Sequence, residues 1–212
     1  MHPTRLRPLF LSIAVLCCTV LTAADGPTLS TSLAWKPTSK LSEAADKINL
    51  TPFSNLKIAL LPLVDNRNDK GLLGENHEKP QARFVRTSDE VAPFVHTHLL
   101  NLMKEAGLPV TDKAEGAAIV VSGELLRFSV LEKDTYQGEF RALLQVRSGE
   151  KIVWKGMAVG RVTRFGRSYK LENYHEVLSD CLVEAVSRLL SDEVFISVLA
   201  GKAMVVAVPA AN

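Results

Sequence analysis

The residues best suited to chemistry in this chain are its few histidines. His96 and His98 lie two positions apart, and on a helix that spacing points them in different directions, so we expect both to be solvated. His77 and His175 have no partner at the spacing of a metal site. The chain also lacks a Gly-x-Ser-x-Gly nucleophile turn and a glycine-rich phosphate loop. The sequence therefore predicts no catalytic residue, no metal and no cofactor.

The sharpest polar feature is the step Asp65-Asn66-Arg67, which directly follows an apolar run at residues 57–64. The segment loosely resembles a calcium loop, but Arg67 occupies a ligand position and Lys70 precedes the glycine, which breaks the pattern. Two interpretations stay open. Either Asp65 and Arg67 anchor a turn at the end of a strand, or the three residues form a contact loop for a partner.

The N-terminus has the order of a secretory signal peptide. Arg5 and Arg7 form a basic start, residues 9–21 are almost wholly apolar, and Ala23-Ala24 offers small residues for cleavage. The apolar run is short for a membrane span, which needs about 20 residues. We expect an exported, periplasmic protein. The alternative is an uncleaved signal that anchors the chain in the membrane.

The three cysteines predict no disulfide framework. Cys17 and Cys18 lie inside the signal, and bulky residues precede them where a lipidated cysteine needs small ones, so lipidation at either is possible but fits poorly. Loss of the signal leaves Cys181 alone. Because Cys181 lies on an apolar helical face, we expect a buried and inert thiol. A membrane association would then require the uncleaved signal or a lipid anchor.

Charge and composition divide the chain into four parts. Residues 1–24 are the signal, and without its two arginines the 25 basic residues fall to 23, which equals the 23 acidic ones. This balance indicates no basic face for nucleic acid. Residues 25–55 are polar and indicate a leader or tether. A single domain follows at 56–201, and 202–212 form a C-terminal tail.

Periodicity of the apolar residues predicts the elements of that domain. A helix is expected to open at the capping-box sequence Thr87-Ser88-Asp89-Glu90 and to end at Gly107. Residues 65–87 are expected to form a polar connection with a short strand at its end, and residues 204–208 an optional edge strand. A bulge is expected just after Gly123, where the apolar parity switches. The remaining strands are expected at 57–64, 117–131, 136–146 and 152–165, and further helices at 173–191 and 192–199.

The resulting order is strand, helix, three strands, helix. Three consecutive antiparallel strands form a meander, with a hairpin turn at residues 147–151. Two main helices then cover one face of a mainly antiparallel sheet. The fold class is a two-layer α+β domain.

The chain resembles the YajG-like bacterial envelope lipoproteins, an uncharacterised family. The resemblance rests on the strand that ends in Asp65 and Arg67, the helix between Thr87-Ser88-Asp89 and Ala106-Gly107, the strand at 120–130 and the helix at 174–192. The architecture is also similar to that of auxiliary lipoproteins of lipid-transporting ABC systems. The resemblance implies an envelope protein without known chemistry.

Three functional hypotheses follow. The first is a non-enzymatic periplasmic or envelope protein that binds a protein partner, in envelope assembly or maintenance, through the connection at 65–87 or a sheet edge. The alternative is a carrier of a lipid or small molecule, or an auxiliary component of an ABC-type transport system. A carrier requires an apolar groove between sheet and helices. The third is an enzyme of unrecognised type, which requires a deep polar pocket.

Overall fold

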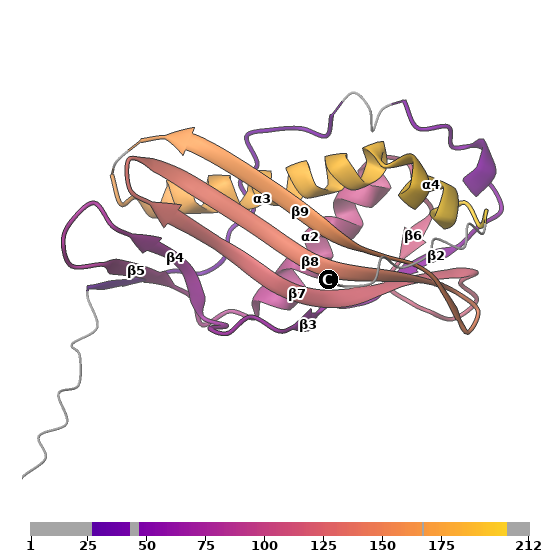
Figure 1. The fold of residues 1–212 in the computed structure, drawn as a ribbon, viewed down its shortest axis with the longest axis horizontal. Coiled ribbons are helices and arrows are strands. Elements are labelled where there is room, and N and C mark those ends of the chain that lie inside the picture. The colour runs from indigo at the N-terminus through magenta and orange to yellow at the C-terminus, as the bar shows by residue number, and fades with distance from the viewer. Residues whose placement is uncertain (1–26, 43–46, 167, 203–212) are drawn as a thin grey trace, which may run out of the picture.

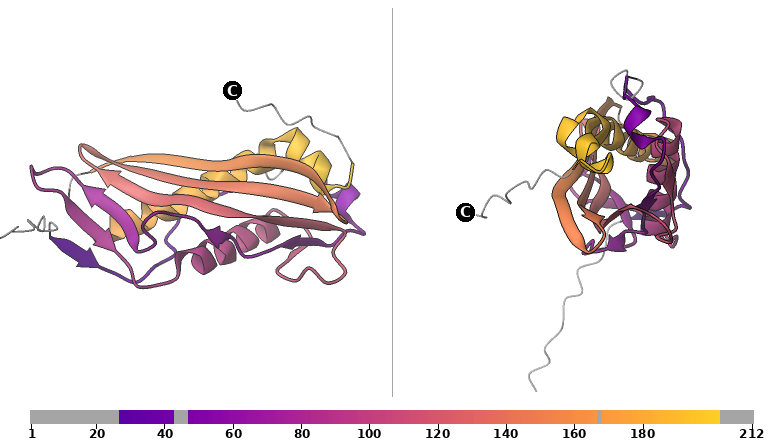
Figure 2. Two further views of the ribbon diagram at one scale, coloured as in Figure 1. Left: turned by 60° about the horizontal axis from the view of Figure 1, so that its bottom comes forward. Right: turned by 90° about the vertical axis from the view of Figure 1, so that its right-hand side faces the viewer.

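The structure is a computed structural model that describes residues 27–42, 47–166 and 168–202. It is a two-layer α+β fold in which a long, open, mainly antiparallel sheet packs against helices on one of its faces (Figures 1 and 2). This confirms the predicted fold class. The strands are β1 (Thr28–Ser30), β2 (Ile58–Leu60), β3 (Val64–Asp65), β4 (Leu72–Asn76), β5 (Arg83–Arg86), β6 (Val110–Thr111), β7 (Ile119–Glu132), β8 (Thr135–Ser148) and β9 (Lys151–Phe165). The helices are α2 (Val91–Glu105), α3 (Leu171–Ser191), α4 (Glu193–Leu199) and the 3₁₀ turn η1 (Thr51–Phe53).

The meander β7–β8–β9 forms the largest part of the sheet, and its strands pair antiparallel, as predicted. The bulge, however, lies at Leu126, between the paired residues Leu125 and Arg127, and not just after Gly123. Gly123 stays in register opposite Leu144, where a side chain would collide with β8. The glycine therefore serves close approach of two strands, while the bulge pushes Leu126 to the outside.

Three short strands extend the sheet beyond β7. β2, β3 and β4 each run parallel to β7, one after another along its length. The predicted strand at 57–64 is thus two strands, because Pro62 lacks an amide hydrogen and the chain leaves the ladder there. β2 is not an edge, since β6 pairs with its other side.

The connection at 65–87 is more ordered than composition suggested. Its end forms β5, as expected, but β4 was not predicted; the two pair as an antiparallel hairpin, and β1 adds to β5 in parallel. The sequence pattern does not identify β4 as a strand, because only Leu73 among its large apolar side chains is fully buried. A strand of five residues with one core contact carries little periodic signal.

The helices begin and end close to the predicted residues. α2 starts at Val91, so the expected capping box is wrong: Thr87 instead accepts a hydrogen bond from the amide of Asp89, ahead of the helix. Pro93 therefore falls in the first turn, where few amide bonds are lost. α3 and the short α4 match their expected ranges to within two residues.

The core lies between the meander and the helices. α3 packs closely on β9, where Gly160 faces the backbone of Cys181 so closely that a β-carbon at this position would collide with the Cys181 carbonyl oxygen. Cys181 is fully buried, and burial raises the pKa of its thiol to about 12, as expected of an inert cysteine. No helix in the part of the chain that the structure describes is long and apolar enough to cross a membrane. The predicted signal with Cys17 and Cys18, and the tail strand at 204–208, lie outside the described residues.

Candidate functional site

The structure places Asp65 and Arg67 against each other and not at the surface. The Arg67 guanidinium donates from Nε to Asp65 Oδ1 and from Nη2 to Asp65 Oδ2, both at 2.9 Å, and also to the carbonyl oxygens of Lys70 and Leu72. Arg67 is only 7% exposed. Burial alone would raise the pKa of Asp65, but the hydrogen bonds and charge of Arg67 outweigh it and lower that pKa. The pair anchors the strand end and the loop after it.

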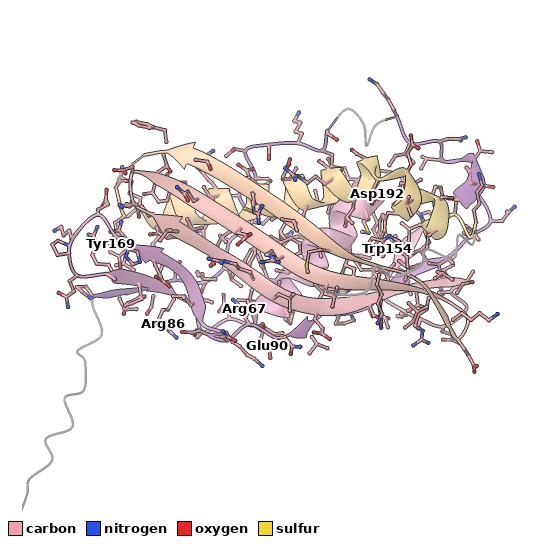
Figure 3. All side chains as sticks on the ribbon, viewed as in Figure 1. Arg67, Arg86, Glu90, Trp154, Tyr169 and Asp192 are labelled. Atoms are coloured by element: carbon pink, nitrogen blue, oxygen red, sulfur yellow. The ribbon has the colours of Figure 1, made fainter. Side chains whose placement is uncertain are left out.

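Asn66 is the one exposed member of the step. Its amide donates to the Glu124 carboxylate at 2.9 Å, and so it lies at the margin of the meander. Figure 3 shows Arg67 in the same part of the molecule as Arg86 and Glu90, with Tyr169 toward one end and Trp154 and Asp192 toward the other. Of the three residues predicted as a contact loop, only Asn66 presents its side chain to solvent.

The histidines are not the solvated residues that we expected. His98 stacks on Trp35, with ring centroids 4.0 Å apart, and burial lowers its pKa. The His96 ring lies 2.9 Å from the carbonyl oxygen of Leu60. Both histidines are half-buried, because Trp35 covers His98 and the end of β2 lies against His96. Within the described residues no three His, Cys, Asp or Glu side chains are grouped as a metal site.

Glu132 is a buried carboxylate just beyond the strand predicted at 117–131. It ends β7 and accepts hydrogen bonds from the Tyr174 hydroxyl at 2.7 Å and from the amides of Ser168 and Tyr169 at 3.0 and 2.9 Å. Burial alone would raise its pKa, but donors that include the Asn76 side chain lower it. With no exposed surface, Glu132 holds the start of α3 against the sheet and contacts no solute. Its partner Tyr174 is 42 residues away, so no local signal marks it.

Asp180 of α3 is a second buried carboxylate. Its two oxygens accept hydrogen bonds from the amides and hydroxyls of Thr38 and Ser39, at 2.6 to 2.9 Å. Burial would raise its pKa, but these donors lower it. Part of the segment predicted as a tether therefore lies along the domain, where Thr38 and Ser39 bind this helix.

The side of the sheet away from the helices concentrates the exposed apolar side chains. We define the outer face as the outward-pointing residues of β7, β8 and β9 together with Val64 of β3. Seven of the eight exposed large apolar side chains in the described residues lie on it, and only Leu50 lies elsewhere. The seven are Val64, Leu126, Leu131, Leu143, Ile152, Met157 and Phe165.

Strand register accounts for this concentration. Leu143 and Met157 are directly paired, and Glu124 and Val64 continue the same row across β7 and β3. Their chain neighbours, such as Leu144, point to the core. In Figure 1, β7, β8 and β9 pass in front of α2, so the view looks onto the outer face. Single exposed apolar residues are ordinary on protein surfaces, but here seven of them share one face of the sheet.

The charges of the outer face are unevenly paired. Glu139 contacts both Arg127, at 3.1 Å, and Arg161, at 2.8 Å. Arg141 lies directly opposite Arg127 on the adjacent strand, and its buried Nε has no hydrogen-bond partner among the described residues. Like charges opposite each other in a sheet are destabilising, and a buried unpaired donor adds to the cost. The face therefore lacks anionic groups that its cations require.

Comparison with known proteins gives distant structural similarity only. No family model matches the chain, and no curated protein matches it. Protein XCC0632 from Xanthomonas campestris, assigned to DUF330, aligns at 8% identity and a TM-score of 0.48, covering 82% of this chain and 96% of that one. A putative lipoprotein from Caulobacter crescentus aligns at 14% identity and 0.40, covering 52% and 84%. Lipoprotein GNA1162 from Neisseria meningitidis aligns at 12% and 0.34, covering 55% and 90%.

These values are too low to imply a shared function. Two of these three neighbours are named as lipoproteins, one of them as putative. The resemblance to the YajG-like family stays a prediction.

Proposed function

We propose that this chain is an exported, non-enzymatic envelope protein that acts by binding, with the outer face as its contact surface. The observation that carries the proposal is the placement of seven of eight exposed large apolar side chains on that one face. Export is inferred from the N-terminal sequence. The absence of an enzymatic role is inferred from the buried polar groups Glu132, Asp180 and Arg67, which are all engaged in internal hydrogen bonds.

The test asks whether the outer face is covered in the cell. Single cysteines are introduced by Met157→Cys on the outer face and by Glu184→Cys on α3, with Cys17 and Cys18 changed to serine in both proteins. Met157 is 40% exposed as a residue and the Glu184 side chain is 38% exposed, so both positions are open to a labelling reagent. Cys181 gives little background because it is fully buried.

Maleimide labelling is compared between envelope preparations and the purified proteins. We expect the cysteine at 157 to be protected in the envelope and labelled after purification, and the cysteine at 184 to be labelled in both. Equal labelling of position 157 in the two samples would overturn the proposal. The experiment does not depend on the identity of whatever covers the face.

A carrier function is a second candidate, favoured by one groove. A cavity of about 510 Å³ lies between the segment around η1 and the helices α3 and α4, with Ile48, Phe53, Leu190 and Ile196 in its lining. This volume is within the usual range for small-molecule sites. The groove does not lie between sheet and helices, where a carrier site was expected. Native mass spectrometry that finds no co-purified ligand would count against a carrier.

A further inference from the structure

The charge of the outer face indicates what kind of surface it binds. Five cations lie on the face against two carboxylates, a net charge of +3, although the chain after residue 24 is formally neutral. The cations are Arg127, Arg141, Arg147, Lys155 and Arg161, and the carboxylates are Glu124 and Glu139. On the neighbouring β4, Glu75 pairs with His77 and marks the limit of this cationic region. The outer face therefore carries an excess of positive charge that the chain after residue 24 as a whole does not have.

The pairing within the face leaves Arg141 in particular need of an anion. Glu139 already forms ion pairs with both Arg127 and Arg161. The Glu124 carboxylate accepts a hydrogen bond from the Asn66 side chain. Arg141 faces Arg127 across the strand pair, and its Nε lacks an acceptor among the described residues. An incoming anionic group between the two arginines would offset the repulsion between their side chains.

The apolar side chains are arranged differently from those of a protein-binding hot spot. Leu143 and Met157 are paired, but the others stand apart, separated by charged residues, and Phe165 is the one aromatic among them. Protein interfaces concentrate aromatic anchors in a centre depleted of charge. A second copy of the same face is also disfavoured, since it would bring like charges together. Separated apolar side chains among cations suit the headgroup region of an anionic bilayer.

We infer that the outer face rests on an anionic lipid surface, with Arg127 and Arg141 at lipid phosphates and Met157 and Phe165 among the headgroups. The inference rests on the proposed function, because it names what covers the contact surface. It gives the domain a route to the membrane that needs neither an uncleaved signal nor a lipid anchor. The attraction is expected to weaken with salt, since exposed charges are screened over about 10 Å at 0.1 M ionic strength.

The test uses the mature protein recovered from cells that make the full chain with Cys17→Ser and Cys18→Ser, so that no lipid anchor contributes. Co-sedimentation is measured with vesicles of phosphatidylglycerol mixed with phosphatidylcholine and with vesicles of phosphatidylcholine alone. We expect binding to the anionic vesicles only, and loss of binding at high salt.

Three variants locate the binding. Arg127→Gln with Arg141→Gln removes two cations from the face and should lower the partition to anionic vesicles about tenfold or more. Lys104→Gln with Arg188→Gln removes two exposed cations from α2 and α3 and should leave the partition within about twofold of the parent. Phe165→Ser should weaken binding with an unchanged dependence on salt. Circular dichroism confirms that each variant is folded.

Two results would overturn the inference. One is absence of binding to anionic vesicles, and the other is equal loss in both double variants. If vesicles do not bind while position 157 remains protected in the envelope, a protein covers the face, and the proposed function stands without this inference. If position 157 is unprotected as well, both fail.

Discussion

Charged side chains on the two sides of the sheet differ in how completely they are paired. On the inner side, Arg67 makes a two-point pair with Asp65, and Glu132 and Asp180 receive hydrogen bonds on both oxygens. On the outer face, Arg141 stands opposite another arginine, and its Nε is unpaired within the described residues. The inner charges are arranged for stability, and the outer ones are arranged at a cost to it, which is typical of a surface that awaits a ligand.

The same substitution on the two faces gives the largest expected contrast. Arg67→Leu leaves Asp65 without its partner in a largely buried site and should lower the free energy of unfolding by about 3 kcal/mol. Arg141→Leu removes a repulsive pair and should change it by less than about 0.5 kcal/mol. Urea denaturation of both variants measures the difference, and similar losses would contradict the distinction between the faces.

The two faces of β9 also differ in how closely another part of the chain approaches them. Gly160→Ala places a methyl group against the carbonyl of Cys181, so α3 must move from β9, at a cost of about 2–3 kcal/mol. Val159→Ala, one residue along and on the outer face, should cost about 1 kcal/mol or less. Thermal unfolding of the two variants would show the order. A more severe effect at Val159 would mean that the outer face is a packed interface.

The buried carboxylate Glu132 offers a comparison within one residue type. Glu132→Gln loses hydrogen bonds to a charged acceptor and should lower the free energy of unfolding by about 2 kcal/mol at neutral pH. Glu139→Gln on the outer face breaks only ion pairs to exposed arginines and should cost under about 1 kcal/mol. Urea denaturation at neutral pH compares the two, and an equal loss would contradict the greater role of the buried carboxylate.

The effect of Glu132 should also depend on pH. Because folding lowers the pKa of this carboxyl from its ordinary 4.5, the ionised form is favoured in the folded state, and its contribution is complete above pH 4.5. It is lost as the pH falls through the lower folded-state pKa. The wild type and Glu132→Gln should therefore converge in acid. A difference that stays constant between neutral and acidic pH would exclude an ionised Glu132.

The smallest expected effect concerns the N-terminal segment. Asp180→Asn presents amide hydrogens to the donors of Thr38 and Ser39 and should cost about 1–2 kcal/mol. The segment should then detach, and trypsin should cleave faster after Lys40. Glu184→Gln, on the same helix, serves as the control because Glu184 pairs only with exposed Arg188 among the described residues. Unchanged cleavage in Asp180→Asn would show that other contacts hold the segment.

Regular elements could be predicted, but short ones could not. The meander and α3 carry long apolar repeats, so their positions follow from periodicity. β1 and β4 have only three and five residues, and each pairs with a strand distant in the chain, β1 with β5 and β4 with β7. The same is true of the candidate site: Asp65 and Arg67 are close in sequence and were foreseen as a possible pair, whereas Glu132 and Asp180 needed partners 42 and 142 residues away.

The amino-acid sequence alone determined the fold class, the meander, the inert character of Cys181 and the absence of a recognisable catalytic motif, because each depends on local pattern or composition. It also contained the alternation that exposes Leu143 and Met157, but not which face the helices would cover. Only the tertiary structure decided that, since α3 lies on the side where Gly160 admits its backbone. The outer face, on the opposite side, therefore keeps its apolar and cationic side chains exposed. This is the surface that we propose acts in binding.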